Sequence, residues 1–392
     1  PAQGKMDISV VNIEENAGQV PVNYVLPPGV TRIIDPGQSQ ITQLNEQAMS
    51  LKVTDLQSGD ARAVYKNSGM DMRTYKRLQM FVHAEKLIDD KTNLRDGDVS
   101  VFLRLGSDSK SNYYEYEVPL SLTEPGNYST YNAQDQEAVW PQSNMFDFPL
   151  SLFTDLKLER NAKKRMDNST VTFQTRYSSY DPDKNQNKVT IVGNPSLSDV
   201  RTMMIGVRNN SNAAKDIVVW VNEMRLTDFD QSGGWAAKAN VNLGLSDIAT
   251  LNIAGHVETV GFGGIDQSLT ERRLDDYYQY NIATMVELGR FLPEKVKLKA
   301  PLFYSITEQR TSPKYNPLDQ DILLKDALDN AGSKAERDSI SDASIEKSTV
   351  ESFSLSGVSF DIRSKNPMPY DPANFSISYS YNRQSKQDPT TE

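Results

Sequence analysis

From about residue 71 to residue 230, apolar and polar residues alternate with a period of two. This period indicates β-strands that bury one face. The alternation runs through residues 78–82, 99–105, 114–120, 171–177, 203–207 and 217–221. Clusters of turn-forming residues separate these runs, for example at 93–98 and 181–183. The pattern predicts an antiparallel β-sandwich of jelly-roll type over residues 71–230, and therefore an all-β fold class.

The first 70 residues show little periodicity. Proline and glycine are closely spaced there, at Pro21, Pro27, Pro28, Gly29 and Pro36. Proline lacks a backbone N–H and glycine readily adopts turn conformations, so both interrupt regular structure. We therefore expect residues 1–70 to form an extended arm or edge strands ahead of the sandwich.

After Gly234 the alternating runs lengthen to about ten residues. They cover 235–245, 250–260, 280–289, 296–306, 351–362 and 373–383. One side of each run is apolar, and the other is rich in small, neutral residues. Strands of soluble proteins usually have ~5–6 residues, whereas ~9–11 residues with this alternation are typical of membrane-spanning barrels. Residues 231–310 and 351–392 are therefore predicted to be transmembrane barrel strands.

The two sides of these strands predict two environments. We expect the apolar side chains to face lipid: Trp235, Val241, Leu243, Leu251, Ile253, Val286, Leu288, Leu298 and Leu302. We expect the opposite side chains to face a water-filled lumen: Lys238, Asn240, Asn242, Asn252, His256, Asn281, Lys297 and Lys299.

The connections between the long runs alternate in length. Residues 246–249 and 290–294 make short turns, whereas 261–279 and 308–350 make long loops. Outer-membrane barrels have short periplasmic turns and long external loops. We therefore expect the sandwich and the long loops at the cell surface. The loop region 311–350 is predicted to contain a short helix at 319–330.

Six such strands do not close a transmembrane barrel. The smallest closed barrels have eight strands, and an open edge leaves backbone groups unpaired in hydrocarbon. The remaining strands are expected either in flanking sequence of a longer polypeptide or in other subunits. The chain begins at Pro1 without a signal-peptide pattern, so we interpret it as a fragment or a mature internal piece.

Composition excludes most kinds of active site. The 392 residues include no cysteine and only two histidines, His83 and His256. Zinc fingers, iron–sulfur clusters, thiol nucleophiles and multi-histidine metal sites therefore cannot form. The net charge of −10 disfavours binding to nucleic acid. We predict no catalytic residue, no metal and no cofactor.

Two features of the sandwich allow further hypotheses. Residues 181–187 place oxygen ligands at alternating positions, as a calcium loop does, but Gln186 and Val192 stand where glycine and glutamate are required. A hairpin loop is the favoured interpretation. A group of tyrosines could stack on sugars, although core and edge positions are the favoured explanation. These are Tyr113, Tyr114, Tyr116, Tyr128 and Tyr131.

Several stretches of the sequence resemble the SprA/Sov family, the outer-membrane translocons of the type IX secretion system in Bacteroidetes. They are residues 25–30, 59–63, 75–85, 199–208, 220–229 and 315–319. Long stretches such as WVNEMRLTDF at 220–229 are specific to this family. The resemblance runs over most of residues 20–330.

The resemblance implies a very large single-chain β-barrel, incomplete in this chain, through which folded cargo proteins leave the periplasm. Gliding motility is a linked trait in some members. The implied partners are a PorV-type outer-membrane shuttle protein, a periplasmic plug protein and secreted cargo with a C-terminal signal domain. Outer-membrane lipid would surround the wall, and no enzymatic activity is expected. The alternative is a soluble, surface-exposed β-sandwich adhesin or carbohydrate-binding module, whose long strands pair into another sandwich.

Overall fold

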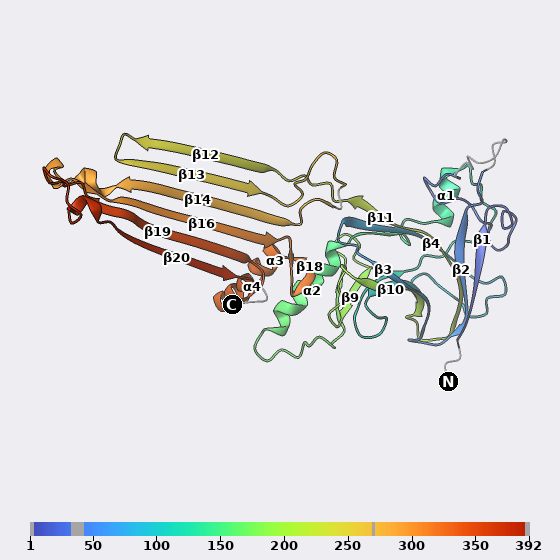
Figure 1. The fold of residues 1–392 in the computed structure, drawn as a ribbon. Helices are drawn as coiled ribbons and strands as arrows, with labels where there is room; N and C mark the ends of the chain where they lie inside the picture. The colour runs from blue at the N-terminus through green and yellow to red at the C-terminus, as the bar shows by residue number, and fades with distance from the viewer. Residues whose placement is uncertain (1–3, 33–42, 269–270, 389–392) are drawn as a thin grey trace. The chain divides into compact units, whose positions relative to one another are not determined.

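The computed structural model describes residues 4–32, 43–268 and 271–388. The chain divides into two compact units, residues 1–230 and 231–392 (Figure 1). Both units consist mainly of antiparallel strands, so the predicted all-β class is confirmed. Among the described residues, no helix is both long enough and apolar enough to cross a bilayer.

The described strands of the first unit form two sheets. One has the order β1-β2-β11-β4-β7 and the other the order β3-β10-β5-β6-β9-β8. The strands are β1 Lys5–Asn12, β2 Gln47–Leu56, β3 Ala61–Met70, β4 Tyr75–Glu85, β5 Val99–Gly106, β6 Tyr113–Pro119, β7 Phe146–Pro149, β8 Tyr177–Tyr180, β9 Lys188–Val192, β10 Val200–Asn209 and β11 Lys215–Phe229.

The pairing of these strands follows a jelly-roll path. β2 pairs with β11, β3 with β10, β4 with β7 and β5 with β6. The strands β2, β3, β4 and β5 therefore lie beside β11, β10, β7 and β6, in reverse chain order, as in a long hairpin that folds over into two sheets. β1 extends the first sheet, and β9 and β8 extend the second. The predicted jelly roll is confirmed.

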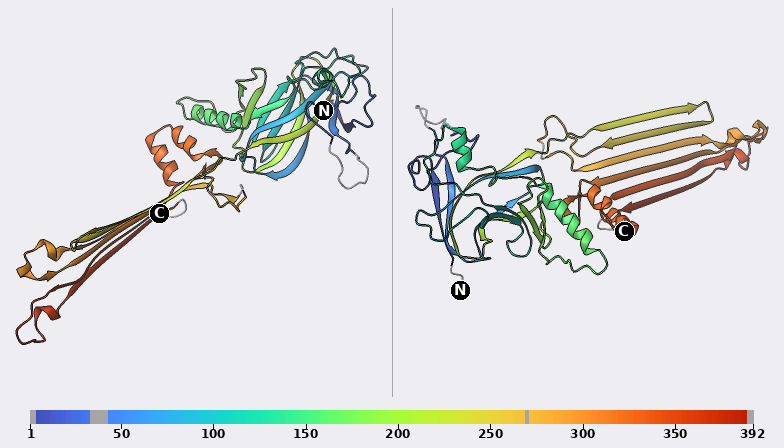
Figure 2. Two further views of the ribbon diagram at one scale, coloured as in Figure 1. Left: turned by 90° about the horizontal axis from the view of Figure 1, so that it is seen from above. Right: turned by 180° about the vertical axis from the view of Figure 1, so that it is seen from behind.

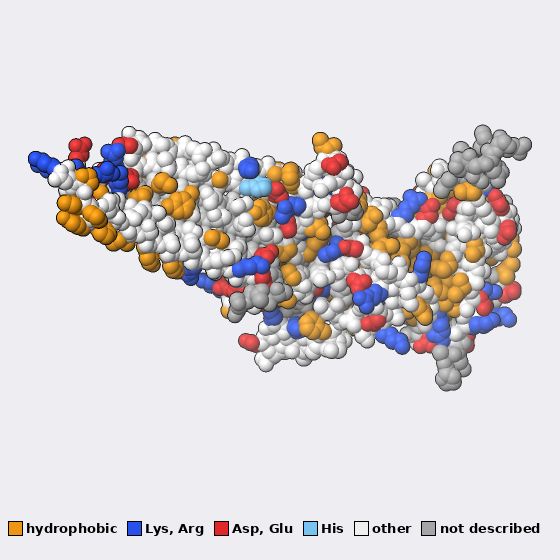
Figure 3. Space-filling model, in the orientation of Figure 1, with side chains coloured by type: hydrophobic (Ala, Val, Ile, Leu, Met, Phe, Trp, Pro, Cys, Tyr) orange, Lys and Arg blue, Asp and Glu red, His pale blue; other side chains and the backbone are white. Residues whose placement is uncertain are grey.

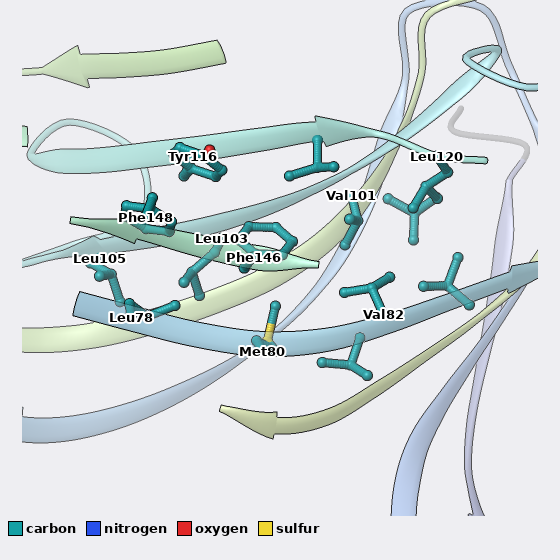
Figure 4. Close-up of a cluster of buried hydrophobic side chains, with 14 of the residues drawn as sticks. Leu78, Met80, Val82, Val101, Leu103, Leu105, Tyr116, Leu120, Phe146 and Phe148 are labelled. Carbon is teal, nitrogen blue, oxygen red and sulfur yellow. The ribbon is translucent and has the colours of Figure 1, made fainter. Parts of the chain in front are cut away.

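The main core of this unit lies between the two sheets, where the alternate residues of facing strands meet (Figure 4). Leu78 and Met80 of β4 and Leu103 of β5 are fully buried in it. The Tyr116 ring of β6 stacks on the Phe148 ring of β7, with 3.9 Å between ring centroids. Burial of such side chains is the dominant stabilising term for a domain of this size.

The first 70 residues differ from the predicted arm. β1 and β3 are edge strands, but β2 lies inside the first sheet, where Leu51 and Val53 are fully buried. The proline-rich segment before β2 also packs against the sandwich, because Val22 and Tyr24 are buried in a second apolar cluster with Trp220. Prolines interrupt the strand pattern in this segment without preventing burial of its apolar side chains.

Two helices in this unit were not predicted, α1 Ala133–Val139 and α2 Ser151–Lys164. α2 buries Phe153 and Leu156 together with the charged Lys157, whose Nζ donates to the Pro195 carbonyl at 2.7 Å. The predicted strand at 171–177 is wrong, because residues 171–176 have no strand pairing and β8 begins only at Tyr177. The Phe173 ring instead lies beneath the Lys164 ammonium group, 3.6 Å from it.

The second unit contains a sheet of long strands that pair in chain order (Figure 1). Seen edge-on in Figure 2, they form a single layer. Among the described residues, β12 and β20 each pair along one edge only, so the sheet is open. The long strands are β12 Ala236–Leu245, β13 Ala249–Glu258, β14 Asp275–Glu287, β16 Pro301–Pro313, β19 Glu346–Phe360 and β20 Ile377–Gln387.

The connections of this sheet differ at its two ends. Long connections, 259–274 and 314–345, join strands at the end where β12 begins, and we call this the long-loop end. The other end, the short-turn end, has the turn 246–248 and two further connections with 3₁₀ turns. These contain Leu288–Phe291, Glu294–Val296, β15 Leu298–Lys299 and Pro372–Asn374. The longer of the long connections contains β17 Tyr315–Asn316, β18 Asp319–Leu323, α3 Leu324–Asp329 and α4 Lys334–Asp342.

Two predicted elements of this unit need correction. The strand predicted at 296–306 is split, because Lys297 adopts a left-handed conformation with φ of 49° and β16 begins at Pro301. The helix predicted at 319–330 begins only at Leu324, because β18 pairs with β17 first.

Candidate functional site: the two faces of the long sheet

The register of the long strands sorts their side chains onto two faces. Directly opposite residues of an antiparallel pair point to the same face. Val241 lies opposite Ile253, which lies opposite Ile282. Asn242 lies opposite Asn252 in the neighbouring register position. We call the face that carries Val241, Ile253 and Ile282 the apolar face, and the one that carries Asn242 and Asn252 the polar face.

The polar face consists mainly of uncharged amide and hydroxyl side chains. They hydrogen-bond across strands, from Asn252 Nδ2 to Asn242 Oδ1 and from Asn281 Nδ2 to Thr307 Oγ1, both at 2.6 Å. In Figure 3 the long sheet shows the face with the pale blue histidine, and most of it is white rather than charged. The uncharged polar residues include Asn240, Asn242, Thr250, Asn252, Gln279, Asn281, Ser305, Thr307, Gln309, Ser352, Ser354, Ser380, Asn382 and Gln384.

Charged groups on the polar face gather at the long-loop end. His256 Nε2 lies 3.0 Å from Glu258 Oε1, and Arg273 of the following connection lies 2.5 Å from Glu258 Oε2. Arg273 also contacts Asp275, and this hydrogen bond raises the pKa of the guanidinium group above its usual value. The charges of this group are therefore largely balanced at the rim of the sheet.

The structure groups most of the residues proposed for the two environments as expected. Six lumen candidates share the polar face: Lys238, Asn240, Asn242, Asn252, His256 and Asn281. Six lipid candidates share the apolar face: Val241, Leu243, Leu251, Ile253, Val286 and Leu302. Trp235 continues the alternation of β12, because its carbonyl accepts a hydrogen bond from the Thr259 N–H at 2.9 Å. That one face meets lipid and the other meets water stays a prediction.

Four predicted residues lie outside the long strands. Leu288 belongs to a 3₁₀ turn, Lys297 ends the next one, and Leu298 and Lys299 form β15. The strand β14 ends before them because the Glu287 carboxylate accepts hydrogen bonds from the backbone N–H groups of Gly289 and Ala300 and so closes a turn. The strand positions predicted for Leu288 and Lys297 were wrong, whereas Leu298 and Lys299 pair with Phe360 and Ser359 of β19. Whether any of the four faces lipid or water stays a prediction.

On the apolar face, the apolar residues do not stop at the same height on every strand. The limit nearest the long-loop end shifts from β12 to β20. On β12 apolar positions reach back to Ala237, whereas on β20 the last one is Tyr381, directly in line with Leu243 of β12. The six residues from Ala237 to Leu243 span ~20 Å at ~3.3 Å per residue. The five strand spacings from β12 to β20 span ~24 Å at ~4.8 Å each. This limit is therefore slanted by about 40° from the perpendicular to the strands.

The opposite limit of the apolar region shifts in the same direction. β12 ends at Leu245, in line with Tyr379 of β20. Beyond that line, β19 and β20 still pair Val358 with Ile377. The apolar side chains therefore occupy a slanted band rather than a rectangle along the strands.

Aromatic and charged side chains mark the long-loop limit of this band. The Tyr280 hydroxyl donates to Glu308 Oε2 at 3.1 Å, and the Tyr304 hydroxyl donates to Glu351 Oε1 at 2.9 Å. Each tyrosine thus adjoins the band with its ring and the charged residues beyond it with its hydroxyl. Sequence reasoning missed Glu308, because β16 continues beyond the predicted strand 296–306. It did not single out Glu351, although the predicted strand 351–362 begins at that residue.

The other candidate chemistry of the chain does not assemble into a site. His83 is fully buried, with its ring 4.0 Å from the Trp220 ring and its Nδ1 2.7 Å from the Val139 carbonyl oxygen. Among the described residues, no group of three or more His, Asp or Glu side chains is placed to hold a metal ion. The Asp181 carboxylate instead accepts a hydrogen bond from the Tyr116 hydroxyl at 2.6 Å. Tyr113, Tyr114 and Tyr116 are buried and Tyr131 is almost fully exposed.

Comparison with known proteins gives one finding. No curated protein matches the chain. The family model described as SprA_N, motility related/secretion protein, matches residues 1–328. This match covers most of the chain, including the sandwich and the strands β12 to β16. The chain therefore belongs to the SprA_N family of motility-related and secretion proteins.

Proposed function

We propose that this chain is part of an outer-membrane channel that exports folded cargo proteins, the translocon of a type IX secretion system. The sheet from β12 to β20 would form a segment of the channel wall. The single observation that carries this proposal is the slanted apolar band on one face of a single-layered sheet. Membrane barrels require such a band, because their strands tilt by ~35–45° from the barrel axis.

The dimensions of the band are close to those of a membrane barrel. From Ala237 to Leu245 the chain advances eight residues, which is ~26 Å along the strand. A slant of about 40° reduces this to ~20 Å perpendicular to the limit of the band, and membrane barrels have apolar bands ~25 Å tall. The tyrosines at the limit then correspond to the aromatic girdle of such barrels.

The polar face supports passage of large, varied cargo. Its amide and hydroxyl groups hydrogen-bond to one another or to water, and most of its charged groups lie at the long-loop end, whereas Glu287 at the short-turn end is engaged by backbone N–H groups. A folded protein of either charge would meet few sites where it could bind tightly. The mechanism is geometric and requires no catalytic residue. A wide aqueous pore would leak small molecules, so a plug or gate is needed.

Connectivity supports the proposed orientation. The chain enters β12 at the long-loop end, and long connections of outer-membrane barrels face the outside. We therefore infer that residues 1–230 and the long loops are at the cell surface, where the jelly roll could brace or cover the opening. The proposed partners are a PorV-type shuttle protein, a periplasmic plug protein and cargo with a C-terminal signal domain.

The alternative is a soluble adhesin or carbohydrate-binding module. This alternative requires a second layer to cover the apolar face, and among the described residues the long sheet is a single layer (Figure 2). Val241, Leu243 and Leu245 remain about half exposed. A soluble monomer rarely exposes an apolar surface of this extent.

Cysteine accessibility tests the proposal, because the chain contains no cysteine. Single cysteines at successive positions 237–245 of the full-length protein would be treated in native outer membranes with a water-soluble maleimide. We expect labelling at 238, 240, 242 and 244, and protection at the odd positions until detergent is added. The protein should also remain with the membrane after a carbonate wash. Release by carbonate, or equal labelling at odd and even positions, would refute the proposed membrane wall.

A further inference from the structure

We propose that Arg310, Lys347 and Arg383 form a binding site for phosphate-bearing lipid headgroups on the apolar face of the long sheet. The site lies just past the long-loop limit of the apolar band. This inference rests on the proposed membrane location and adds a ligand class to it.

The register places the three cations on one face of three successive strands. Arg310 of β16 lies directly opposite Lys347 of β19. Arg383 of β20 lies directly opposite Glu351 of β19. Arg310 shares its line of residues with Tyr278 and Val257, so all three cations are on the apolar face. All three are exposed.

The carboxylates of the patch already have partners. Glu308 Oε2 accepts a hydrogen bond from the Tyr280 hydroxyl and lies 3.2 Å from Lys347 Nζ. Glu351 accepts from the Tyr304 hydroxyl. In the part of the chain that the structure describes, Arg310 and Arg383 have no hydrogen bond or ion pair. Three cations against two carboxylates leave an excess of positive charge, carried by two guanidinium groups that are free to bind an anion.

The direct pairing of Arg310 with Lys347 also favours a bound anion. Like charges directly opposite on neighbouring strands destabilise a sheet. An anion held between them would remove this repulsion. Arginine is well suited to the task, because its planar fork of N–H groups matches the oxygens of a phosphate.

A recess next to these groups supplies further donors. It has a volume of about 320 Å³, and hydroxyl and amide groups line it together with the charged residues. The lining residues are Lys347, Thr349, Glu351, Arg383, Ser385 and Gln387. Hydroxyl and amide groups hydrogen-bond to phosphate or sugar oxygens without adding negative charge.

The position of the patch selects a lipid rather than a free anion. Arg383 is two residues from Tyr381, the last apolar position on β20, so a molecule bound there would also contact the apolar band. A phosphorylated glycolipid could contact both surfaces, with its acyl chains along the apolar band and its phosphates on the cations. At the corresponding line on β12 and β13, Ala237 and Val257 offer no such charge.

The experiment uses the full-length protein, purified in a non-ionic detergent, with three probes: diphosphorylated lipid A, the same lipid without phosphates, and inorganic phosphate. Bound lipid is measured by native mass spectrometry at several concentrations. The test variant combines Arg310→Ser, Lys347→Ser and Arg383→Ser. The control combines Lys238→Ser and Lys386→Ser on the polar face, and so removes two cations where the test variant removes three. A charge-preserving variant combines Arg310→Lys, Lys347→Arg and Arg383→Lys.

We expect the wild-type protein and the polar-face control to bind the diphosphorylated lipid equally, and the test variant to bind it at least tenfold more weakly. The charge-preserving variant should bind more tightly than the test variant, because it keeps three cations at these positions. The test variant should show the same thermal unfolding transition as the wild-type protein, so that a folding defect is excluded as the cause. Added salt should weaken binding. Unchanged binding by the test variant would overturn the proposal. Equal binding of the lipid without phosphates, or displacement by millimolar inorganic phosphate, would also overturn it.

This result is separable from the proposed function. If the wild-type protein is released from membranes by carbonate, the membrane location itself is wrong. If the protein stays in the membrane while the test variant binds lipid normally, only the headgroup site is wrong.

Discussion

Asn242 and Asn252 lie directly opposite each other on β12 and β13, and Asn252 Nδ2 donates a hydrogen bond to Asn242 Oδ1 at 2.6 Å. One residue along each strand, Val241 and Ile253 form the equivalent pair on the other face without a polar atom in either side chain. Adjacent positions of β12 therefore require opposite kinds of side chain, apolar at residue 241 and polar at residue 242. This contrast allows a test in which backbone position and strand pairing hardly change.

We predict that Val241→Arg destabilises the inserted protein by ~2–4 kcal/mol, whereas Asn242→Arg costs less than about 1 kcal/mol. Val241 lies near the middle of the apolar band, so an arginine there would place its charge in hydrocarbon. At residue 242 the same side chain would extend into water. The measurement is urea-induced unfolding of the full-length protein in lipid vesicles. Similar losses at both positions would argue against a lipid-facing surface.

We predict that residues 1–230 fold without the remainder of the chain. The jelly roll has its own core between its two sheets, and this unit is compact by itself. The expected result is a soluble fragment with a single cooperative thermal transition. Replacing the buried Leu103 with alanine should then lower the free energy of unfolding by ~2–5 kcal/mol. A fragment that shows no cooperative transition would mean that the unit needs the long sheet to fold.

We predict that Glu115→Gln costs ~3–5 kcal/mol at neutral pH. Glu115 is fully buried, with Arg104 at 2.5 Å and Arg176 at 2.6 Å, and Arg208 at 3.1 Å. Removing its charge would leave three guanidinium groups without their shared partner. The matched control is Glu159→Gln, which breaks a half-exposed pair with Lys163 and should cost less than about 1 kcal/mol.

The contribution of Glu115 to the free energy of unfolding should depend on pH. Burial alone would raise the pKa of Glu115, but the hydrogen bond and charge of Arg208, with Arg104 and Arg176, outweigh burial and lower the pKa. An unfolded glutamate has a pKa of ~4.3. The stabilisation is therefore complete above that pH and is lost as the pH falls through the lower folded pKa. The difference between wild type and Glu115→Gln should shrink below about pH 4, as measured by denaturant unfolding at each pH; a difference that stays constant would contradict this.

We predict that Gly193→Ala destabilises the first unit far more than Gly29→Ala. Both glycines have positive φ, 73° and 75°, so alanine is strained at either position. At Gly193 a Cβ would also lie 2.0 Å from the Ser111 carbonyl oxygen, whereas at Gly29 it meets nothing within 4 Å. We expect ~1–2 kcal/mol at Gly29 from strain alone, and a clearly larger loss at Gly193. Equal losses would show that the loop moves to relieve the clash.

Period-two patterns predicted the strands whose two faces differ in polarity, from β4, β5 and β6 to the six long strands. They failed where burial does not follow a two-residue period. α2 was missed because Lys157 and Arg160 are buried on the face that also holds Phe153, so its pattern lacked a clean apolar stripe. The segment with Val22 and Tyr24 was missed because irregular chain has no period, although both side chains are fully buried.

The two faces of the long sheet could be predicted from the sequence only in part. Alternation is local, so Val241 and Asn242 were placed on opposite faces correctly. The ends of strands were not predictable in this way, because β14 stops where the Glu287 side chain closes a turn onto Gly289 and Ala300. Which residues lie directly opposite each other on neighbouring strands could not be predicted either, since the register depends on pairing partners far away in the sequence. The slanted band and the Arg310–Lys347 pair emerge only from that register.

The half-exposed apolar side chains of β12 have a consequence for biogenesis. Before neighbouring strands pair, each strand also offers a free edge, which is a template onto which any other extended chain can add. If the strands reach the outer membrane through the periplasm, they must travel with these apolar side chains uncovered. We therefore expect holdase chaperones to limit the yield of this protein, and their depletion should produce insoluble aggregates before any defect in cargo synthesis is seen.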